Sequence, residues 1–457
     1  MNYKQITAAI INIEQNLNLF SVEENGVFIW KMARMQVMDN LITKVNNISS
    51  VHGLRENKDK LLNSLLLFIN SVIDNPFTIN KNKENIFFEN PRKTIWNNVC
   101  IDPYTHFFIK ELSNYHVIEG VYKSKLVKSV HNPSSPINLL LLMSKLREVM
   151  LRKISFSENT INTLKKVERN LKSDIGIEVP VAAIALKQYK TFLATYSVYD
   201  ALFKMKKWNK IHLVCSYGKE PIIAAAQKNN IRVYELQHGT LGPYHLGYHF
   251  PNTDNVPYFP DEFLLFGEFW SDITSLPSYT KAKYIGHLFL NEQLKYYKQK
   301  IDEKQNQAIT VISQGTIGKQ LSEFMLEVIR RLSDFRFQYK LHPGEFKRWK
   351  QEYPALVELS NFNNVSIYED EKPLYEMLAE SKYTIGVYST ALFEAIAFQS
   401  NPIIIKLPGY EYMNDYRNQC RSRLFDKPNE LMSYLLNNSY NTEKLNDSNY
   451  YFYGSYI

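Results

Sequence analysis

Apolar and polar positions change their spacing near residue 80. Before that point apolar side chains recur at helical intervals, and Ile29, Met32 and Met35 are three residues apart. Leu61–Ile73 is a second apolar segment of helical length, followed by a polar stretch rich in Asn and Lys. This pattern predicts a helical N-terminal extension over residues 1–80.

After residue 80, short apolar runs of strand length alternate with longer amphipathic segments. Lys210–Cys215 and Ile231–Leu236 have the composition of buried strands and flank a predicted helix, Glu220–Lys228. Alternation of this kind in two blocks predicts two doubly wound, Rossmann-like α/β domains facing a cleft. We expect the first domain at residues 81–290, a polar linker at 291–307, the second domain at 308–425, and a C-terminal helix and tail at 426–457.

Composition narrows the class of protein. The chain has 457 residues, of which 45% are hydrophobic, so it can bury a core of normal size and is not a disordered protein. Three widely separated Cys exclude a disulfide scaffold and fit a reducing compartment. The N-terminus has no secretory signal, and the longest apolar runs fall short of the roughly 18 residues that span a bilayer. We therefore expect a cytoplasmic protein.

The chain has a modest net charge of +8, which could favour an anionic binding partner. Basic residues gather at Lys123–Lys128 and at Lys145, Arg147, Arg152 and Lys153. They form either a solvated helix surface or a face that docks to anionic lipid or an acidic glycan, at the inner side of the cytoplasmic membrane. No clustered Arg/Lys motif supports binding of nucleic acid.

The strongest candidate site in the second block lies where a predicted strand ends and a helix begins at Ser389 and Thr390. Free N–H groups and the positive dipole of a helix N-terminus bind phosphate, and two hydroxyls add donors. The alternative is an ordinary N-cap. Glu394, one turn into the helix, fits no capping box; it is either a ribose ligand or a solvated carboxylate.

Two more loops of the second block carry candidate residues. His342 follows the predicted strand Arg336–Leu341, so its ring lies at the carboxyl edge of the sheet, where it could donate to a phosphate or protonate a leaving group. The loop from Ser313 through Gly315 and Thr316 joins a strand to a helix, and its glycines allow close approach of a phosphate or sugar. It lacks the first glycine of the dinucleotide fingerprint.

The first block places Gln237, His238 and Gly239 after the strand Ile231–Leu236, on the opposite side of the predicted cleft. His238 is a candidate general base toward an acceptor hydroxyl, and Glu235 is a second candidate for that role. Asp102 stands at another strand-to-helix junction, where it either lines the cleft or caps a helix.

A metal site built from His238, His245 and His249 is conceivable, but the spacing matches no metal motif. We expect no metal in the site.

These motifs together resemble GT-B glycosyltransferases of bacterial capsule and lipooligosaccharide biosynthesis. YKLHPGE, followed about forty residues later by the segment 388–402, is similar to the donor domain of polysialyltransferases, sialyltransferases and CDP-glycerol glycerophosphotransferases. The resemblance covers residues 210 to 407. It implies that His342, Ser389 and Thr390 hold the donor phosphate, that Glu394 binds the ribose, and that backbone near Tyr368 meets the base.

The resemblance implies an enzyme that moves a sugar from a CMP- or UDP-linked donor to a hydroxyl of a growing surface glycan. Transfer would be a direct displacement without a metal and without a cofactor other than the nucleotide-sugar co-substrate. Two alternatives stay open: a UDP-sugar 2-epimerase, which shares the donor site, and a non-catalytic subunit that binds a nucleotide sugar or glycan.

Overall fold

The computed structural model describes residues 3–45, 74–80, 82–122, 125–126, 128–415, 423–437 and 448–454. The chain begins with helices α1 (Tyr3–Asn16) and α2 (Trp30–Val45), separated by the turn η1 (Leu19–Ser21) and the hairpin β1 (Glu23–Glu24) and β2 (Val27–Phe28). The predicted helix Leu61–Ile73 lies outside the described residues.

The first domain is built on a seven-stranded parallel sheet of order β13-β12-β11-β10-β3-β6-β9. Its strands are β3 (Asn85–Phe88), β6 (Tyr115–Glu119), β9 (Ser134–Pro136), β10 (Lys210–Val214), β11 (Arg232–Leu236), β12 (Glu262–Leu265) and β13 (Lys281–Tyr284). Two small hairpins lie beside the sheet, β4 (Thr94–Trp96) with β5 (Val99–Ile101) and β7 (Val121–Tyr122) with β8 (Lys125–Leu126). The helices are α4 (His106–Lys110), α5 (Asn138–Met150), α6 (Glu158–Ile175), α7 (Val181–Lys206), α8 (Glu220–Lys228) and α9 (Glu268–Asp272).

The second domain has a six-stranded parallel sheet of order β16-β15-β14-β17-β18-β19. Its strands are β14 (Gln305–Ile312), β15 (Arg336–Lys340), β16 (Val365–Tyr368), β17 (Ser381–Gly386), β18 (Asn401–Ile405) and β19 (Arg423–Phe425). Its helices are α12 (Gly318–Ile329), α13 (Trp349–Glu352), α14 (Pro354–Leu359), α15 (Leu374–Glu380), α16 (Thr390–Ala397) and α18 (Pro428–Asn437), with the turn η2 (Tyr410–Met413).

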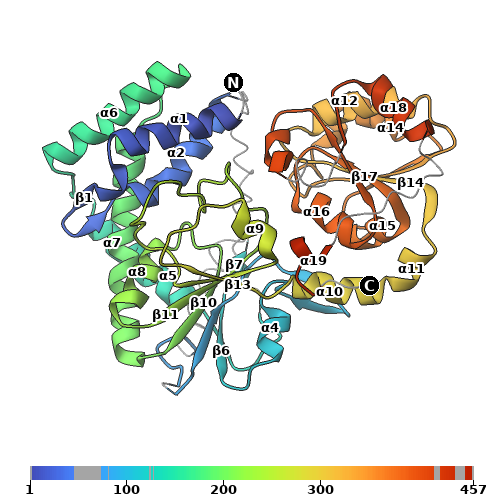
Figure 1. Ribbon diagram of the computed structural model, residues 1–457. Coiled ribbons are helices and arrows are strands. Elements are labelled where there is room, and N and C mark those ends of the chain that lie inside the picture. The colour runs from blue at the N-terminus through green and yellow to red at the C-terminus, as the bar shows by residue number, and fades with distance from the viewer. Residues whose placement is uncertain are drawn as a thin grey trace.

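Two parallel-sheet domains with a helical N-terminal region confirm the predicted GT-B architecture (Figure 1). Continuous apolar runs form these strands because both faces of a parallel sheet are covered by helices. β3, β12 and β17 are buried along their whole lengths, as that rule requires. The carboxyl ends of the strands carry the loops that hold the candidate residues.

Three segments differ from the expectation. The polar stretch predicted as a linker contains two helices, α10 (Leu288–Tyr296) and α11 (Lys298–Asp302), because buried residues such as Leu294 and Ile301 are spaced among charged ones. The region between residues 139 and 172 is helical, as its sequence pattern predicts, but it is interrupted between α5 and α6, and the Ser157 side chain accepts a hydrogen bond from the Thr160 N–H at the start of α6. The sequence pattern also predicts a helix over Pro103–Leu112, and the helix in the structure is shorter, because α4 starts at His106.

The C-terminal tail returns to the first domain. The short helix α19 (Ser448–Tyr451) packs against α9 and α16, and the Tyr453 N–H donates to the Phe266 carbonyl at 2.7 Å. The indole N–H of Trp270 donates to the Tyr451 carbonyl at 2.8 Å. The tail therefore ties the end of the second domain to strand β12 of the first.

The N-terminal helices belong to the same hydrophobic core as the first domain. α2 packs on the long helix α7 and α1 packs on α6, at the upper left of Figure 1. Arg34 of α2 is buried and forms an ion pair with Glu14 of α1, with 2.6 Å between Nε and Oε1. Among the described residues, no helix is long and apolar enough to cross a membrane.

Candidate functional site

Helix α16 begins at the carboxyl end of β17, as the sequence predicts. Ser389 is the N-cap, and its Oγ accepts a hydrogen bond from the Ala391 N–H at 3.2 Å. Both Ser389 and Thr390 are half-buried, whereas residues 391–397 of the helix are buried. The capping role that we considered for Ser389 is therefore present, and it leaves the hydroxyl of Thr390 at the start of the helix.

Glu345 organises the neighbouring loops, and the sequence analysis gave it no role. Its buried carboxylate accepts from Ser313 Oγ at 2.8 Å and from the His342 N–H at 2.7 Å. A Cβ on Gly318 would lie 1.9 Å from Glu345 Oε1, so only glycine fits there. Burial raises the pKa of Glu345. The Ser313 hydroxyl is thus engaged inside the protein. The sequence feature that could have predicted this contact is an acidic residue three positions after His342.

The two loops meet at Gly315. A Cβ at this glycine would lie 3.7 Å from His342 Nδ1, and Arg348 donates to the Gly315 carbonyl. The Thr316 hydroxyl lies 2.6 Å from the Tyr388 hydroxyl, immediately before Ser389. Three separate loops of the second domain therefore come together, as the sequence predicts for strand ends of one parallel sheet.

His342 lies exposed at this junction. Its Nδ1 accepts from the Gly344 N–H at 3.1 Å, which leaves Nε2 for a ligand. The pKa of His342 is lowered, first by partial desolvation and then by the positive charges of Arg92 and Arg348. A neutral imidazole beside two guanidinium groups is a suitable environment for an anion.

On the side of the first domain, Gln237 holds the loop after β11. Its amide donates to the Gly239 carbonyl at 2.8 Å and accepts from the Phe266 N–H at 2.8 Å. The side chain is 1% exposed, so it positions the loop and does not contact an acceptor. The position of Gln237 in the sequence did not predict this role of its amide in holding the loop.

His238 lies among three tyrosine rings, with centroid distances of 6.2 Å to Tyr104, 6.1 Å to Tyr217 and 6.2 Å to Tyr248. Burial, followed by the charges of His245, Lys219 and Arg92, lowers its pKa to about 3. The imidazole is therefore neutral near pH 7 and can accept a proton, although its basicity is reduced.

Glu235 is fully buried beneath this loop. It accepts from the Ser216 N–H at 3.0 Å and from the Tyr248 hydroxyl. Burial raises its pKa. An acceptor outside the protein does not reach this carboxylate, so its position does not support the catalytic role that we considered for it.

The two domains approach each other closely at Gly239. A Cβ on this glycine would lie 3.7 Å from the Oγ1 of Thr390, across the interface. Arg92, an exposed side chain of the first domain, is close enough to lower the pKa of both His238 and His342. Gly239 and His238 of the first block thus lie near Thr390 and His342 of the second. Sequence reasoning did not identify Arg92, which lies in a loop without a motif.

Glu394 lies deeper in the interface. Its carboxylate is 7% exposed, hydrogen-bonds to Tyr375 and lies 3.8 Å from His287 Nε2. Burial raises the pKa of Glu394 to about 7 and lowers that of His287 to about 3. His287 Nδ1 accepts from the Leu290 N–H at 3.3 Å and caps α10. In this structure Glu394 faces the inter-domain connection.

Asp102 and Tyr368 complete the predicted set. Asp102 is fully buried and accepts from the Asn90 N–H at 2.8 Å, the Tyr104 N–H at 3.0 Å and the Thr105 hydroxyl at 2.8 Å. It holds the turn before α4 and offers no free oxygen to an acceptor.

Tyr368 ends β16 and is half-buried, with the Lys372 ammonium 5.7 Å from its ring centroid.

The histidines that we considered as metal ligands form hydrogen bonds in different parts of the loop. His245 Nδ1 accepts from the Gly247 N–H at 3.2 Å, and His249 Nδ1 accepts from the Ser275 N–H at 3.1 Å. Within the part of the chain that the structure describes, no group of three or more His, Cys, Asp or Glu could hold a metal ion.

Asp39 of α2 is a further carboxylate that the sequence analysis missed. It is exposed, yet partial desolvation raises its pKa. Its charge raises the pKa of Tyr217 in the first domain and of Tyr412 in the second. The N-terminal extension therefore brings an acidic group to the boundary between the domains.

No protein-family model and no curated protein sequence matches the chain. Among solved structures, the chain is similar to UDP-GlcNAc 2-epimerase from Methanocaldococcus jannaschii, at 11% identity and a TM-score of 0.46, over 82% of this chain and 97% of that one. It is similar to UDP-GlcNAc 2-epimerase from Neisseria meningitidis at 13% identity and a TM-score of 0.46, over 82% and 97%. MurG from Acinetobacter baumannii has 11% identity and a TM-score of 0.38, over 55% and 70%. This likeness concerns the fold.

Proposed function

We propose that this protein is a glycosyltransferase that moves a sugar from a nucleotide-activated donor to a hydroxyl acceptor. The observation that carries the proposal is the convergence of Thr390, His342, Arg92 and Gly239 from both domains. Helix dipole, hydroxyl and guanidinium together favour a phosphate at this place. Arg92 and Thr390 come from different domains, so a donor held there would bridge them.

In the proposed reaction, the acceptor oxygen attacks the anomeric carbon of the donor sugar. The bond from that carbon to the phosphate oxygen breaks, and the nucleotide leaves with the electron pair. The N-terminus of α16, Thr390, His342 and Arg92 stabilise the charge that develops on the phosphate. Ser389 shapes the helix end, and Tyr368 lies at the strand end where the base would be held.

The acceptor proton has two candidate destinations. His238 is neutral and lies on the side of the first domain, and Asp39 is a carboxylate with a raised pKa. A raised pKa brings a carboxylate closer to the range in which a general base is effective. His238→Ala and Asp39→Asn, assayed for turnover against nucleotide binding, distinguish the two, because loss of the base lowers kcat and leaves nucleotide affinity unchanged.

The alternative, a sugar-nucleotide 2-epimerase, requires acidic groups beside C2 of the sugar. The carboxylates near the carboxyl edge of the first sheet are engaged within the protein. Asp102 and Glu235 are described above, and Glu119 accepts from the Ser129 N–H at 2.9 Å and from Ser134 Oγ at 2.8 Å. These three carboxylates are therefore held inside the protein, and Asp39→Asn, which removes the exposed carboxylate at the domain boundary, tests epimerisation as well as transfer. A subunit that only binds would show nucleotide affinity without turnover.

The test is a thermal-shift screen with CMP, CDP, UDP and GDP, followed by turnover assays. A ligand at about 100 times its dissociation constant stabilises the protein by roughly 2.7 kcal/mol, which is readily measured. We expect a shift with one nucleotide that is reduced in Thr390→Ala and His342→Ala but retained in Thr163→Ala, a helical threonine of the first domain. If no nucleotide changes the melting temperature, the proposal is wrong.

Turnover separates the remaining classes. Transfer to an added glycan acceptor supports the glycosyltransferase. Exchange of the C2 hydrogen of the nucleotide sugar with deuterated water, in the absence of acceptor, identifies an epimerase. A nucleotide shift without either reaction identifies a binding subunit.

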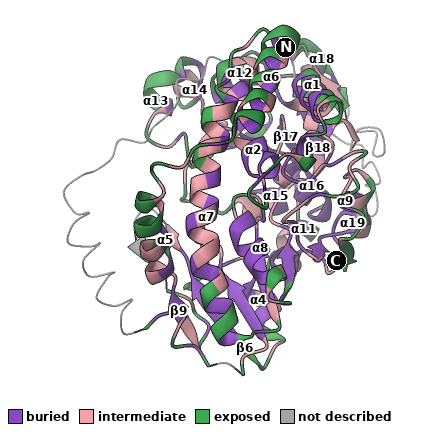
Figure 2. Cartoon of the chain, turned by 90° about the vertical axis from the view of Figure 1, so that its left-hand side faces the viewer, coloured by how far each residue is buried: buried purple, intermediate pink, exposed green. Residues whose placement is uncertain are grey.

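We also propose peripheral contact of this enzyme with an anionic membrane, where a lipid-linked or membrane-proximal acceptor would be found. Leu146, Val149 and Met150 on α5 are 60%, 51% and 81% exposed. Exposed basic residues accompany them at Lys145, Arg147, Arg152 and Lys153. Exposed turns of α5 are green in Figure 2. Apolar and basic side chains together suit a surface of anionic lipid.

A further inference from the structure

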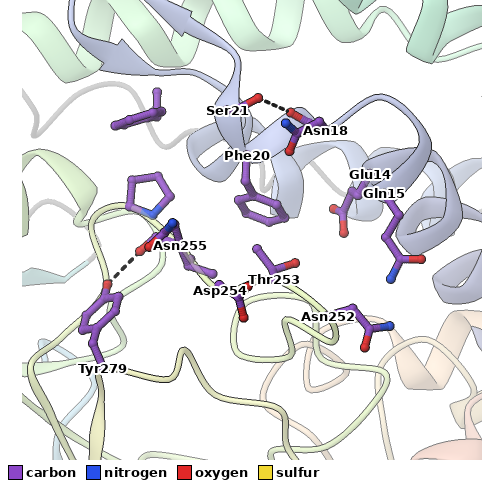
Figure 3. Close-up of a pocket in the computed structure, with 13 residues that line it drawn as sticks. Glu14, Gln15, Asn18, Phe20, Ser21, Asn252, Thr253, Asp254, Asn255 and Tyr279 are labelled. Atoms are coloured by element: carbon purple, nitrogen blue, oxygen red, sulfur yellow. Dashed lines mark hydrogen bonds between the residues drawn. The ribbon is translucent and has the colours of Figure 1, made fainter.

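We propose that a cavity between the N-terminal helices and the loop at residues 252–257 binds a neutral oligosaccharide. The cavity has a volume of about 760 Å³, within the range of small-molecule sites. One wall comes from the end of α1 and the segment that follows it, and the other from the loop (Figure 3). The residues proposed above for the donor do not line it.

Aromatic rings form the apolar part of the lining. Phe20, Phe28 and Tyr279 contribute to it, and Phe20 extends toward the loop in Figure 3. Phe20 is fixed by an edge-to-face contact with Phe250, with 5.7 Å between centroids. The Tyr279 hydroxyl donates to the Val256 carbonyl at 2.7 Å, which holds the loop in place. Phe20 is 7% exposed and supports the wall, whereas Tyr279 is 42% exposed and offers a flat face on which the C–H side of a sugar ring can lie.

Polar side chains form most of the remaining lining, and several of them are exposed. Asn18, Asn252, Asp254 and Asn255 line the cavity, and their side chains make no hydrogen bond to another residue in the described part of the chain. Each amide presents a donor and an acceptor side by side, and the carboxylate presents two acceptors. Adjacent hydroxyls of a sugar, which both donate and accept, match this arrangement.

The charge of the lining selects against other ligands. Among the residues that the structure describes, no Lys or Arg lines the cavity. The carboxylate of Glu14 is occupied by Arg34, at 2.6 and 2.7 Å, and by the Trp30 indole N–H at 2.7 Å. Asp254 is therefore the one uncompensated charge that the described part of the chain contributes to the lining. Phosphates and acidic sugars would be repelled, and a single free carboxylate is too few for a metal site. A neutral glycan is the class that remains.

Isothermal titration calorimetry with cellohexaose, maltohexaose and the hexamer of N-acetylglucosamine tests the proposal on the full chain. We expect at least one of them to bind with a dissociation constant of about 1 mM or lower. The double variant Asp254→Ala/Asn255→Ala should weaken that binding at least tenfold. The matched variant Asp334→Ala/Asn363→Ala, exposed residues of the second domain, should bind as the wild type does.

Three outcomes overturn the proposal: no binding of any of the three sugars at about 10 mM, equal binding by both double variants, or binding of oligosialic acid in preference to all of them. A thermal melt of each variant shows that it is folded. The result is independent of the donor site. Nucleotide binding can be absent while glycan binding is present, and glycan binding can be absent while nucleotide binding is present.

Discussion

Gly239 and Thr390 lie against each other across the two domains, although 151 positions separate them in the sequence. A Cβ on Gly239 would be 3.7 Å from Thr390 Oγ1, which is ordinary van der Waals contact. The backbone of the loop after β11 and the first residue of α16 are thus separated by the width of a small side chain. A donor phosphate at α16 must therefore lie beside this glycine, so the size of residue 239 controls the space available.

Substitution of Gly239 provides a graded test of that space. Gly239→Ala adds a methyl group that fits, so its nucleotide affinity should stay near that of the wild type. Gly239→Val adds two further methyl groups toward Thr390 and should weaken nucleotide binding about tenfold, equal to about 1.4 kcal/mol. Titration calorimetry measures both. Equal affinities in the wild type and in Gly239→Val would show that the nucleotide lies elsewhere.

Arg92 should contribute electrostatically to donor binding. Its charge lowers the pKa of His238 and His342, so it is placed to attract an anion between them. Arg92→Ala should weaken nucleotide binding and reduce the dependence of that binding on salt, since one cationic contact is lost. Arg232→Ala, an exposed arginine at the opposite end of β11, serves as the control. Identical salt dependence in Arg92→Ala and the wild type would exclude the contact.

The sequence predicts the sheets of this protein well because buried parallel strands are continuous apolar runs. Lys210–Cys215 and Ile231–Leu236, for example, are predicted to within one residue of the ends that the structure gives to β10 and β11. Helix ends are less predictable. α4 begins three residues after Pro103, because Asp102 and Thr105 bond to one another and form a turn before the helix starts.

The sequence predicts which loops form the candidate site, but it does not predict every side chain that lies there. His342, Ser389 and Gly239 follow strand ends, and strand ends of a parallel sheet meet at one edge. Arg92, Asp39 and Glu345 come to the site through tertiary packing, which local pattern does not encode. The position of Glu235 was not predictable in this way: the carboxylate precedes a promising loop but is buried, because both faces of the parallel sheet are covered.

The face of α5 should bind anionic vesicles. Lys145→Glu/Lys153→Glu reverses two exposed charges beside Val149 and Met150 and should abolish sedimentation with vesicles that contain phosphatidylglycerol. Met150→Asp should weaken it as well, because a charge would enter the apolar layer. Lys166→Glu/Lys172→Glu on α6 is the matched control. Equal sedimentation of all variants would contradict docking through α5.

Glu394 should make stability depend on pH in a defined window. Its folded pKa of about 7 exceeds the ordinary value of 4.5, so the folded state holds the proton more tightly than the unfolded state does. Stability conferred by the protonated form is complete below pH 4.5 and is lost as the pH rises through 7. The full difference is about 3 kcal/mol, from 1.36 kcal/mol per pKa unit. Glu394→Gln removes the titrating group and should be more stable relative to the wild type at pH 8 than at pH 5.

Urea unfolding of both proteins at the two pH values measures this difference. Glu327→Gln on α12, an exposed position, serves as the control and should follow the wild type. His287, whose folded pKa is lowered to about 3, takes up a proton only in the unfolded state as the pH falls below 6.5, which opposes the effect of Glu394; both proteins carry His287, so this contribution cancels in their difference. A difference between Glu394→Gln and the wild type that does not change with pH would exclude a protonated Glu394 in the folded state.

Arg34 should be essential for stability because it joins three segments. Besides Glu14, its guanidinium donates to the carbonyls of Leu246 and His249, in the loop that leads away from His238. Arg34→Met leaves the buried Glu14 carboxylate without its ion-pair partner and two carbonyls without the Arg34 donor, and should lower the free energy of unfolding by about 3–5 kcal/mol. Lys44→Met on the same helix removes an exposed contact to the Glu178 carbonyl and should cost less than about 1 kcal/mol.

A second substitution separates the charge from the packing. Glu14→Gln in the Arg34→Met background removes the uncompensated charge, so the double variant should be more stable than Arg34→Met alone. Urea unfolding of the four proteins gives the coupling energy of the pair. If the two single substitutions were additive, Glu14 and Arg34 would act independently, and the link from the N-terminal helices to the His238 loop would rest on the carbonyl contacts alone.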